Sequence, residues 1–352
     1  MRGWLGAAAA AAVVAGSVVA GMPRASLAAT SPSCAVPSDF RILDDRVTES
    51  SGLAVSRRHP GVVWTANDSG DSGRIFAVDT RTGRTVGVHR FGAPVRDVEA
   101  LAVDPRSGRV LVGDIGDNGR SRTVVRIFWF DEPDLGDTQG EWGSWELAYP
   151  DGPHDAEALA VDPRSGRIVV VTKDSVGGVY ELPASPSRSG VNRLRKVGEA
   201  PAVVTDAAYL PDGSGLVTRT YTSALVLDPK SFAVKASRLL PLMPQGETLA
   251  AWPCGDQLLV GTEGARSDVR VVPVPVRAAT STTSGTTSST TGPTDGGDVS
   301  VEIEGLPPTS TAGDSGSGGP DLGPWLVGVA GGAVALGVSG VLWLRRRRGA
   351  HD

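Results

Sequence analysis

The sequence predicts an all-β fold built from repeated units, and three observations support this prediction. The eleven residues Glu-Ala-Leu-Ala-Val-Asp-Pro-Arg-Ser-Gly-Arg occur twice, at 99–109 and at 157–167. Looser copies recur within 33–276, each with a short apolar run, a turn signal and a β-branched run. No long helical pattern interrupts these runs. Four short strands per unit, at a period near 48 residues, are typical of β-propeller blades. A β-sandwich is the alternative, which the identical repeat disfavours.

The number of blades follows from one aligned position in the first strand of each unit. This position is occupied by Leu53, Leu101, Leu159, Tyr209 and Leu249. The sequence therefore predicts five four-stranded blades, with six as an alternative. The fifth unit has only three strands before the propeller ends at residue 276. We expect the segment 40–43, which precedes the first repeat, to supply the outer strand of the last blade and close the ring.

The two cysteines lie where such a closure would bring them together. Cys34 stands just before the closing strand, and Cys254 stands in the first turn of the fifth unit. Export favours oxidation, so we expect a Cys34–Cys254 disulfide that clamps the ring. In the chain-entropy model a closed loop of about 220 residues contributes roughly 4–5 kcal/mol to stability.

Residues 1–29 have the pattern of a secretory signal peptide. Arg2 supplies a positive start, residues 5–20 are an apolar run, and small residues precede a cleavage site after Ala28 or Ala29. We therefore expect the chain to be exported.

The other end of the chain predicts a membrane anchor. Residues 324–344 are apolar and without charge, long enough to cross a bilayer. An Arg-rich tail, 345–352, follows and is expected to stay in the cytoplasm. Between propeller and anchor, the Ser/Thr/Gly/Pro-rich segment 277–323 is expected to be a disordered stalk with candidate glycosylation sites. The prediction is a single-pass plasma-membrane protein with an extracellular ectodomain. A sortase signal at 306–310 is the alternative, although Ser310 stands where Gly is expected.

The charge of the ectodomain narrows the choice of partners. The chain has a formal net charge of −5, and without its two ends it has 28 basic and 38 acidic residues. Because phosphate binding needs a positive surface, this balance argues against nucleic acid as a partner. It favours cations or cationic ligands, although solubility alone also explains it.

Propeller geometry predicts an acidic channel mouth. The first strand of each blade lines the channel, and the loops between the second and third strands open on the same face. The charged side chains expected there are Glu49, Asp68, Asp97, Glu99, Asp114, Asp117, Asp155, Glu157, Lys173, Asp206, Arg219, Glu247 and Glu263. The chain leaves the last blade on the opposite face, so this mouth is expected to face away from the membrane.

Three interpretations of these acids stay open at this stage. In the first, Lys173 and Arg219 neutralise the carboxylates, and the Asp, Asn and Gly residues only form turns. In the second, a hard cation such as Ca²⁺ binds in the mouth, with Glu99, Glu157 and Glu247 as ligands. In the third, one of these glutamates is the general acid or base of a hydrolase.

No motif identifies catalytic residues. The sequence lacks a Gly-x-Ser-x-Gly elbow, a His-Glu-x-x-His pair and a phosphate loop. The segment 114–125 does not have the ligand spacing of an EF-hand. His154 is expected to be a polar surface residue beside a turn, with a ligand or a base as the alternative role.

Four stretches resemble a family of exported actinobacterial β-propeller proteins, described as WD40-like. They are Glu-Ser-Ser-Gly-Leu-Ala at 49–54, Asn-Asp-Ser-Gly-Asp-Ser at 67–72, Gly-Asp-Ile-Gly-Asp-Asn at 113–118 and Tyr-Pro-Asp-Gly-Pro-His-Asp-Ala-Glu-Ala at 149–158. The resemblance spans about 38–275 and implies a propeller fold and a high-GC Gram-positive source, but no activity. A looser similarity to phytase-like, calcium-dependent propellers rests on the channel acids alone. Because no phosphate pocket of Arg and Lys is evident, the catalytic residues of those enzymes are not carried over.

The function expected from the sequence is a surface-displayed binding or interaction module. Its ligand site is the acidic mouth, and its extracellular ligand or protein partner is unknown. The alternative is a calcium- or metal-dependent hydrolase of phosphoesters, esters or glycosides at the same mouth. A purely structural envelope protein is the third possibility.

Overall fold

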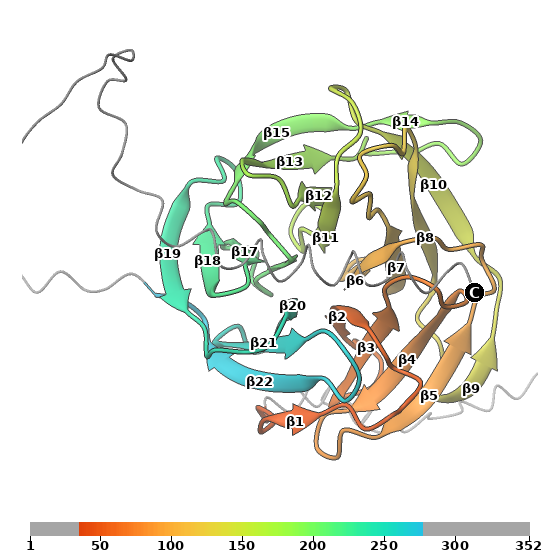
Figure 1. Cartoon of the computed structure of the whole chain (residues 1–352), viewed down its shortest axis with the longest axis vertical. Coiled ribbons are helices and arrows are strands. Elements are labelled where there is room, and N and C mark those ends of the chain that lie inside the picture. Colours follow the sequence, from red (N-terminus) through yellow and green to blue (C-terminus); the bar gives the residue numbers. More distant parts are fainter. Residues whose placement is uncertain (1–34, 277–352) are drawn as a thin grey trace, which may run out of the picture. The chain divides into compact units, whose positions relative to one another are not determined.

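The computed structural model describes residues 35–276, and all regular secondary structure in this part of the chain is β-strand. The strands form five sheets arranged as blades around a central channel (Figure 1). The five-bladed propeller expected from the repeats is therefore confirmed. The predicted signal peptide, stalk, membrane segment and tail lie outside the described residues. Within 35–276, no helix long and apolar enough to cross a membrane is found.

Each blade is named here with its main strands, from the channel outward. Blade 1 contains β2 (Ser50–Val55), β3 (Val62–Asn67), β4 (Arg74–Asp79) and β5 (Thr85–Arg90). Blade 2 contains β6 (Val98–Val103), β7 (Arg109–Asp114), β8 (Val125–Asp131) and β10 (Gly143–Ala148). Blade 3 contains β11 (Ala156–Val161), β12 (Ile168–Thr172), β13 (Gly177–Glu181) and β15 (Arg195–Ala200). Blade 4 contains β16 (Asp206–Tyr209), β17 (Leu216–Arg219), β18 (Ser223–Leu227) and β19 (Val234–Leu239). Blade 5 contains β20 (Gly246–Ala251), β21 (Gln257–Thr262), β22 (Asp268–Pro273) and β1 (Phe40–Arg41).

The ring closes with the N-terminal strand, as the sequence predicts. Strand β1 pairs antiparallel with β22, with Phe40 opposite Val269 and Arg41 opposite Asp268. The Arg41 guanidinium also donates to the Asp268 carboxylate at 2.7 Å. Blade 5 thus combines the two ends of the described chain, so the ring has no open seam at this blade.

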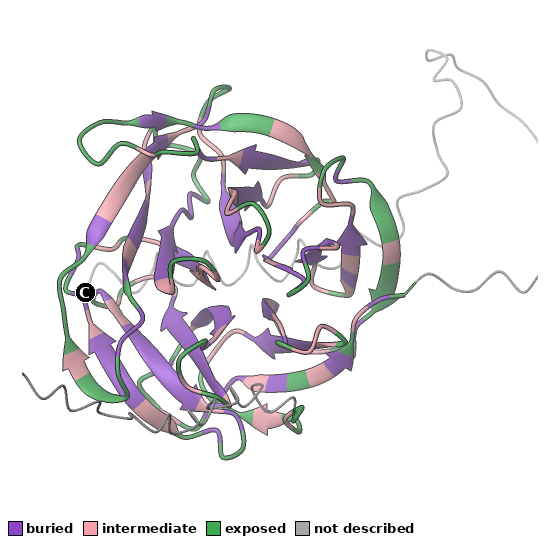
Figure 2. Cartoon of the chain, turned by 180° about the vertical axis from the view of Figure 1, so that it is seen from behind, coloured by how far each residue is buried: buried purple, intermediate pink, exposed green. Residues whose placement is uncertain are grey.

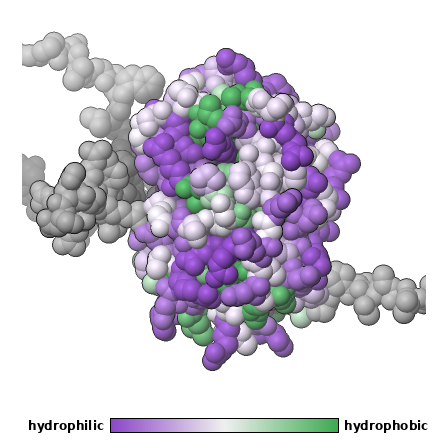
Figure 3. Space-filling model, turned by 90° about the vertical axis from the view of Figure 1, so that its right-hand side faces the viewer, coloured by the Kyte–Doolittle hydropathy of each residue, from purple (hydrophilic) through white to green (hydrophobic). Residues whose placement is uncertain are grey.

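Two blades differ from the prediction of four strands each. Strand β9 (Gly136–Gln139) pairs parallel with β5 on the outer edge of blade 1, although it belongs to the β8–β10 connection of blade 2. Strand β14 (Asn192–Arg193) pairs parallel with β10 on the outer edge of blade 2, although it belongs to the β13–β15 connection of blade 3. Both segments are short and polar, so no apolar alternation in the sequence marks them as strands. The side of the molecule that carries these two blades is mostly hydrophilic, with small scattered apolar patches (Figure 3).

The hydrophobic core is divided into five clusters, one between each pair of neighbouring blades. Successive residues of a strand belong to different clusters, because side chains alternate between the two faces of a blade. In β3, Val63 packs toward blade 5 whereas Trp64 packs toward blade 2. Both faces of the inner strands are therefore buried (Figure 2), which explains their continuous apolar runs.

Cys254 lies in the turn between β20 and β21, as expected, and packs against the cluster between blades 5 and 1 together with Phe40. Cys34 lies outside the described residues. Its disulfide with Cys254 stays a prediction.

Candidate functional site

The innermost strands carry an irregularity at the acidic end of the channel, here called the mouth. In β6 the pairing with β7 skips Glu99, and in β11 the pairing with β12 skips Glu157. Glu247 lies in the equivalent irregular stretch of β20. A β-bulge of this kind turns the extra side chain away from its place in the regular ladder. The bulges thereby place three glutamates at corresponding positions of their blades.

In blade 1 the extra residue of the bulge is Gly52, which has a φ of 73°. A Cβ atom there would lie 2.6 Å from the backbone nitrogen of Leu101 in blade 2. The first two blades therefore approach each other at a point that only glycine fits.

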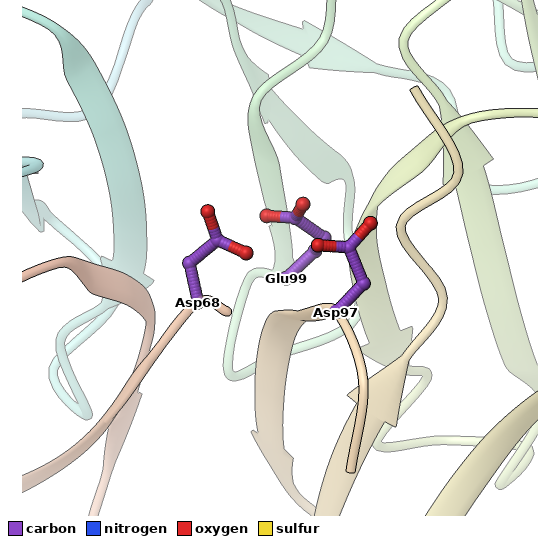
Figure 4. Close-up of side chains that lie close together, drawn as sticks. All are labelled: Asp68, Asp97 and Glu99. Atoms are coloured by element: carbon purple, nitrogen blue, oxygen red, sulfur yellow. The ribbon is translucent and has the colours of Figure 1, made fainter. Parts of the chain in front are cut away.

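Three carboxylates converge between blades 1 and 2. Asp68 follows β3, Asp97 precedes β6, and Glu99 is the bulged residue of β6; their side chains point toward one another (Figure 4). One oxygen from each lies within 4.8 Å of the others. This set, Asp68, Asp97 and Glu99, is called the acidic triad below.

Backbone contacts hold the two loops of the triad together. The Val98 amide donates to the Asp68 carbonyl at 3.2 Å, and an isolated β-bridge joins Ser69 to Asp97. The Asp97 amide donates to the Asp114 carboxylate at 3.0 Å. The positions of the carboxylates are therefore set by main-chain pairing, not by long free side chains.

Ionising all three carboxyl groups of the triad is unfavourable when no cation is bound. Burial, and then the charge of Asp97, raises the pKa of Asp68 to about 8. Burial, and then the charges of Glu157 and Asp68, raises the pKa of Glu99 well above its ordinary value. Burial also raises the pKa of Asp97. Desolvation and like charge both disfavour the ionised forms, so protons are retained unless a cation compensates.

Two further features concern the space around the triad. Asp68 Oδ1 is buried and has no hydrogen-bond partner among the described residues. Gly116 lies against the other two carboxylates, where a Cβ atom would come within 2.6 Å of Asp97 Oδ2 and of Glu99 Oε1. Only a residue without a side chain leaves these carboxylates in place.

The loop that carries Gly116 is fixed by Arg122, which is buried. Its guanidinium pairs with Asp114 at 2.9 Å and donates to the Gly116 carbonyl at 2.6 Å. The Asp117 carboxylate accepts from the Arg122 amide at 2.6 Å, and the Asp117 amide donates to Asp155 at 2.9 Å. Asp114, Asp117 and Asp155 therefore organise this loop.

A basic side chain, Lys173, follows β12 in blade 3 and lies beside Glu157. Lys173 Nζ pairs with Glu157 at 2.8 Å. Burial lowers the pKa of Lys173, but the charges of Glu157 and Glu247 outweigh burial, so the net pKa is raised. Burial raises the pKa of Glu247 to about 7. Glu157, unlike the acidic triad, thus has a direct cationic partner.

Arg219 is placed differently from the expectation that it neutralises carboxylates by direct pairing. It is fully buried and donates to the carbonyls of Thr248 and Gly261 at 2.6 and 2.5 Å. Burial lowers its pKa to about 10, although the charges of Glu247 and Asp206 act in the opposite direction. Asp206 in turn accepts from the Leu249 amide at 2.6 Å. Both residues join blade 4 to blade 5.

The remaining predicted residues lie at the margin of the mouth. Burial raises the pKa of Glu263, whose carboxylate accepts from Gln245 at 2.6 Å. The Glu49 carbonyl accepts from the Asp68 amide at 3.0 Å. All thirteen predicted residues thus belong to loops or strand ends on one face. The metal set expected from the sequence differs, because Asp68 and Asp97 join Glu99 where Glu157 and Glu247 were expected.

Sequence reasoning missed Arg122 and Gly116. Gly116 is the second glycine of the Gly-Asp-Ile-Gly-Asp-Asn stretch, and a glycine between two aspartates is a signal for close packing against neighbouring side chains. Nothing in the sequence distinguishes Arg122 from the other arginines.

His154 also differs from its expected role as a surface residue. Its Nδ1 lies 2.9 Å from Asp174 Oδ2, and its Nε2 lies 3.0 Å from Asp151 Oδ1 and 3.0 Å from Tyr180 Oη. The Tyr180 hydroxyl donates to Asp151 at 2.8 Å. This network ties the loop before β11 to blade 3.

The far end of the channel is chemically different. A cavity of about 570 Å³ opens there, lined by apolar residues of all five inner strands and by prolines of the turns that follow them. The channel is therefore acidic at the mouth, whereas apolar side chains predominate at the other end, with Ser56 and Arg57 among them.

Comparison with known proteins adds no family assignment: no protein-family model and no curated protein matches the chain. The resemblance to exported actinobacterial propellers stays a prediction from the quoted motifs.

Proposed function

We propose that this protein is a binding module whose channel mouth takes a hard divalent cation such as Ca²⁺ between Asp68, Asp97 and Glu99. One observation is the main support. Three carboxylates from two adjoining blades, Glu99 buried and the other two partly buried, point at one another, and one of their oxygens has no hydrogen-bond partner among the described residues. Hard cations prefer several oxygen ligands of this kind.

Electrostatics favours a cation at the triad over the rest of the mouth. Glu157 is already paired with Lys173, and Asp114 with Arg122. Within the described part of the chain, no ion pair includes a member of the triad. A bound cation would offset both the burial and the mutual repulsion that raise the pKa values of these acids.

The direction of the last strands of blade 5 supports a mouth that is accessible to an extracellular ligand. Strand β22 pairs antiparallel with β21, which itself pairs antiparallel with β20, so β20 and β22 both run away from the mouth. The described chain ends at Val276, shortly after β22, on the side of the ring opposite the mouth. With the membrane segment predicted at 324–344, this exit would leave the mouth facing outward.

The test is calorimetric titration of the whole chain with Ca²⁺, together with two alanine variants of one loop. Gly116→Ala adds a methyl group against two triad carboxylates. Gly119→Ala adds one whose nearest neighbour is Ser121 Oγ at 3.7 Å. We expect Gly116→Ala to weaken Ca²⁺ binding by about 10–100-fold, as when the surroundings of metal ligands are disturbed. Gly119→Ala should bind like the wild type.

Equal affinity of the two glycine variants, or no binding heat in the wild type, would overturn the proposal. Hydrolysis at the same mouth stays an alternative from the sequence. Glu247 is its best candidate for acid–base work, since burial brings its pKa to about 7.

A further inference from the structure

The cavity at the far end of the channel is a second concave site, separate from the mouth. Its volume of about 570 Å³ lies within the range of roughly 300–1,000 Å³ that is usual for pockets that bind small molecules. All five innermost strands contribute to its wall, and most of the side chains there are aliphatic. Several of them, including Val55, Val103 and Ala251, are only partly buried. The wall therefore has apolar surface that a bound ligand would remove from water.

The rim of this cavity repeats from blade to blade, with one exception. Two residues after the end of the innermost strand, four blades have a proline that lines the cavity: Pro105, Pro163, Pro211 and Pro253. In all five blades the amide of the preceding residue donates to a carbonyl across the turn, which aligns these positions. Blade 1 has Arg57 at the aligned position.

Arg57 brings a positive charge to this apolar wall. Among the described residues that line the cavity, no other side chain is charged. The Arg57 amide donates to the buried Glu132 carboxylate at 3.2 Å, which fixes the main chain of the turn. Arg57 is exposed, and its guanidinium has no hydrogen-bond or ion-pair partner within the described part of the chain. The neighbouring Arg58, in contrast, pairs with Asp134 at 2.7 Å.

We propose that this cavity binds an amphipathic anion, namely a carboxylate with an aliphatic chain. The chain would lie against the aliphatic wall, and the carboxylate would pair with the Arg57 guanidinium, whose planar geometry suits a carboxylate. An uncharged apolar ligand would leave this guanidinium unpaired, and a cationic ligand would be repelled by it. The proposal does not depend on a cation at the mouth, because other residues form that site.

The experiment is calorimetric titration of the whole chain with hexanoate, heptanoate and octanoate, in a detergent because of the predicted membrane segment. EDTA is present throughout, so that no divalent cation at the mouth contributes. We expect the affinity to rise about fourfold with each added methylene group, as apolar burial predicts.

Two arginines provide a matched pair of variants. Arg57→Ala should weaken octanoate binding about fivefold, the effect of one exposed ion pair, whereas Arg57→Lys should keep most of the affinity. Arg84→Ala is the control and should bind octanoate like the wild type. Arg84 lies in the turn after β4, which runs away from the mouth, so this turn is on the face of the cavity. Arg84 is also exposed and has no side-chain partner among the described residues, but it does not line the cavity.

Equal octanoate affinity of the two alanine variants, or no binding by the wild type, would overturn the proposal. Uptake of octanoate by the detergent is the same for both variants, so it cannot produce a difference between them. Photolabelling with an octanoate that carries a diazirine gives a second measure. The label should attach to the segments 53–61 and 101–105 of the wall, and labelling confined to other segments would contradict the site. Either failure leaves the cation site untouched, because the glycine variants test that site separately.

Discussion

At the scale of single residues, the carboxylates of the mouth differ in whether a cationic side chain pairs with them. Lys173 pairs with Glu157, as the purely structural interpretation expects. Arg122, which that interpretation did not include, pairs with Asp114. The acidic triad is the exception, because its members have no such partner within the described residues. The same carboxylates that make the mouth costly are therefore the ones that would gain most from a cation.

The raised pKa values give a prediction about pH. Between about pH 4 and 8 the folded chain keeps a proton on Asp68 that the unfolded chain has released, because its folded pKa is about 8. The pKa of Glu99 is also raised by burial, so its proton acts in the same direction. Stability in the absence of divalent cations should therefore fall as pH rises through this window. Thermal unfolding in EDTA measures it.

Asp68→Asn removes one of these groups and should flatten the fall, with a higher Tm than the wild type at pH 8. Asp45→Asn, whose side chain is 81% exposed, is the control and should keep the wild-type slope. Added Ca²⁺ should reduce the fall in the wild type more than in Asp68→Asn. An unchanged slope in Asp68→Asn would contradict the assignment of these protons.

At the scale of elements, a very short segment, strand β1 and the residues after it, closes the ring. Strand β1 has only two residues, yet the residue after it, Ile42, is fully buried in the cluster between blades 5 and 1. Its neighbour Leu43 is 39% exposed. The closure thus depends on the packing of Ile42 as well as on the two residue pairs between β1 and β22.

These neighbours form a matched pair for a test of the closure. Ile42→Ala should cost about 2–5 kcal/mol of unfolding free energy, because it leaves a cavity between the first and last blades. Leu43→Ala should change stability by less than about 0.5 kcal/mol. Urea unfolding followed by tryptophan fluorescence measures both. Equal costs would show that the closure does not depend on this buried contact.

At the scale of the whole molecule, the ring is closed at blade 5, where the first and last described strands pair. The predicted disulfide would link the chain at the same place. Cys254 lies against the same cluster as Phe40 of the closing strand, which places it near the start of the described chain. A covalent link here would tie the first and last parts of the propeller together.

We therefore expect Cys254→Ser to lower the unfolding free energy by roughly 4–5 kcal/mol relative to the oxidised chain. The wild type treated with reductant should show a similar loss, and the variant should show none on the same treatment. Thiol labelling of the denatured wild type that finds two free cysteines would contradict the disulfide.

How much of the fold could be predicted depends on the range of the interactions. The blades, their number and the closing strand follow from local patterns that repeat along the chain, such as the eleven residues at 99–109 and 157–167. The strands β9 and β14 could not be predicted, because short polar segments become strands only when another blade offers an edge. Propeller topology also assigns each loop to a face, so the sequence predicts which residues lie at the mouth.

Which of these residues contact one another follows from the three-dimensional arrangement of the blades. Asp68 joins Asp97 and Glu99 across a blade boundary, and a bulge turns Glu99 out of its ladder. Arg219 turns to backbone carbonyls where a carboxylate partner was expected. Side-chain pairing inside the ring depends on distances of a few ångströms between blades, and a linear pattern of residues does not contain those distances.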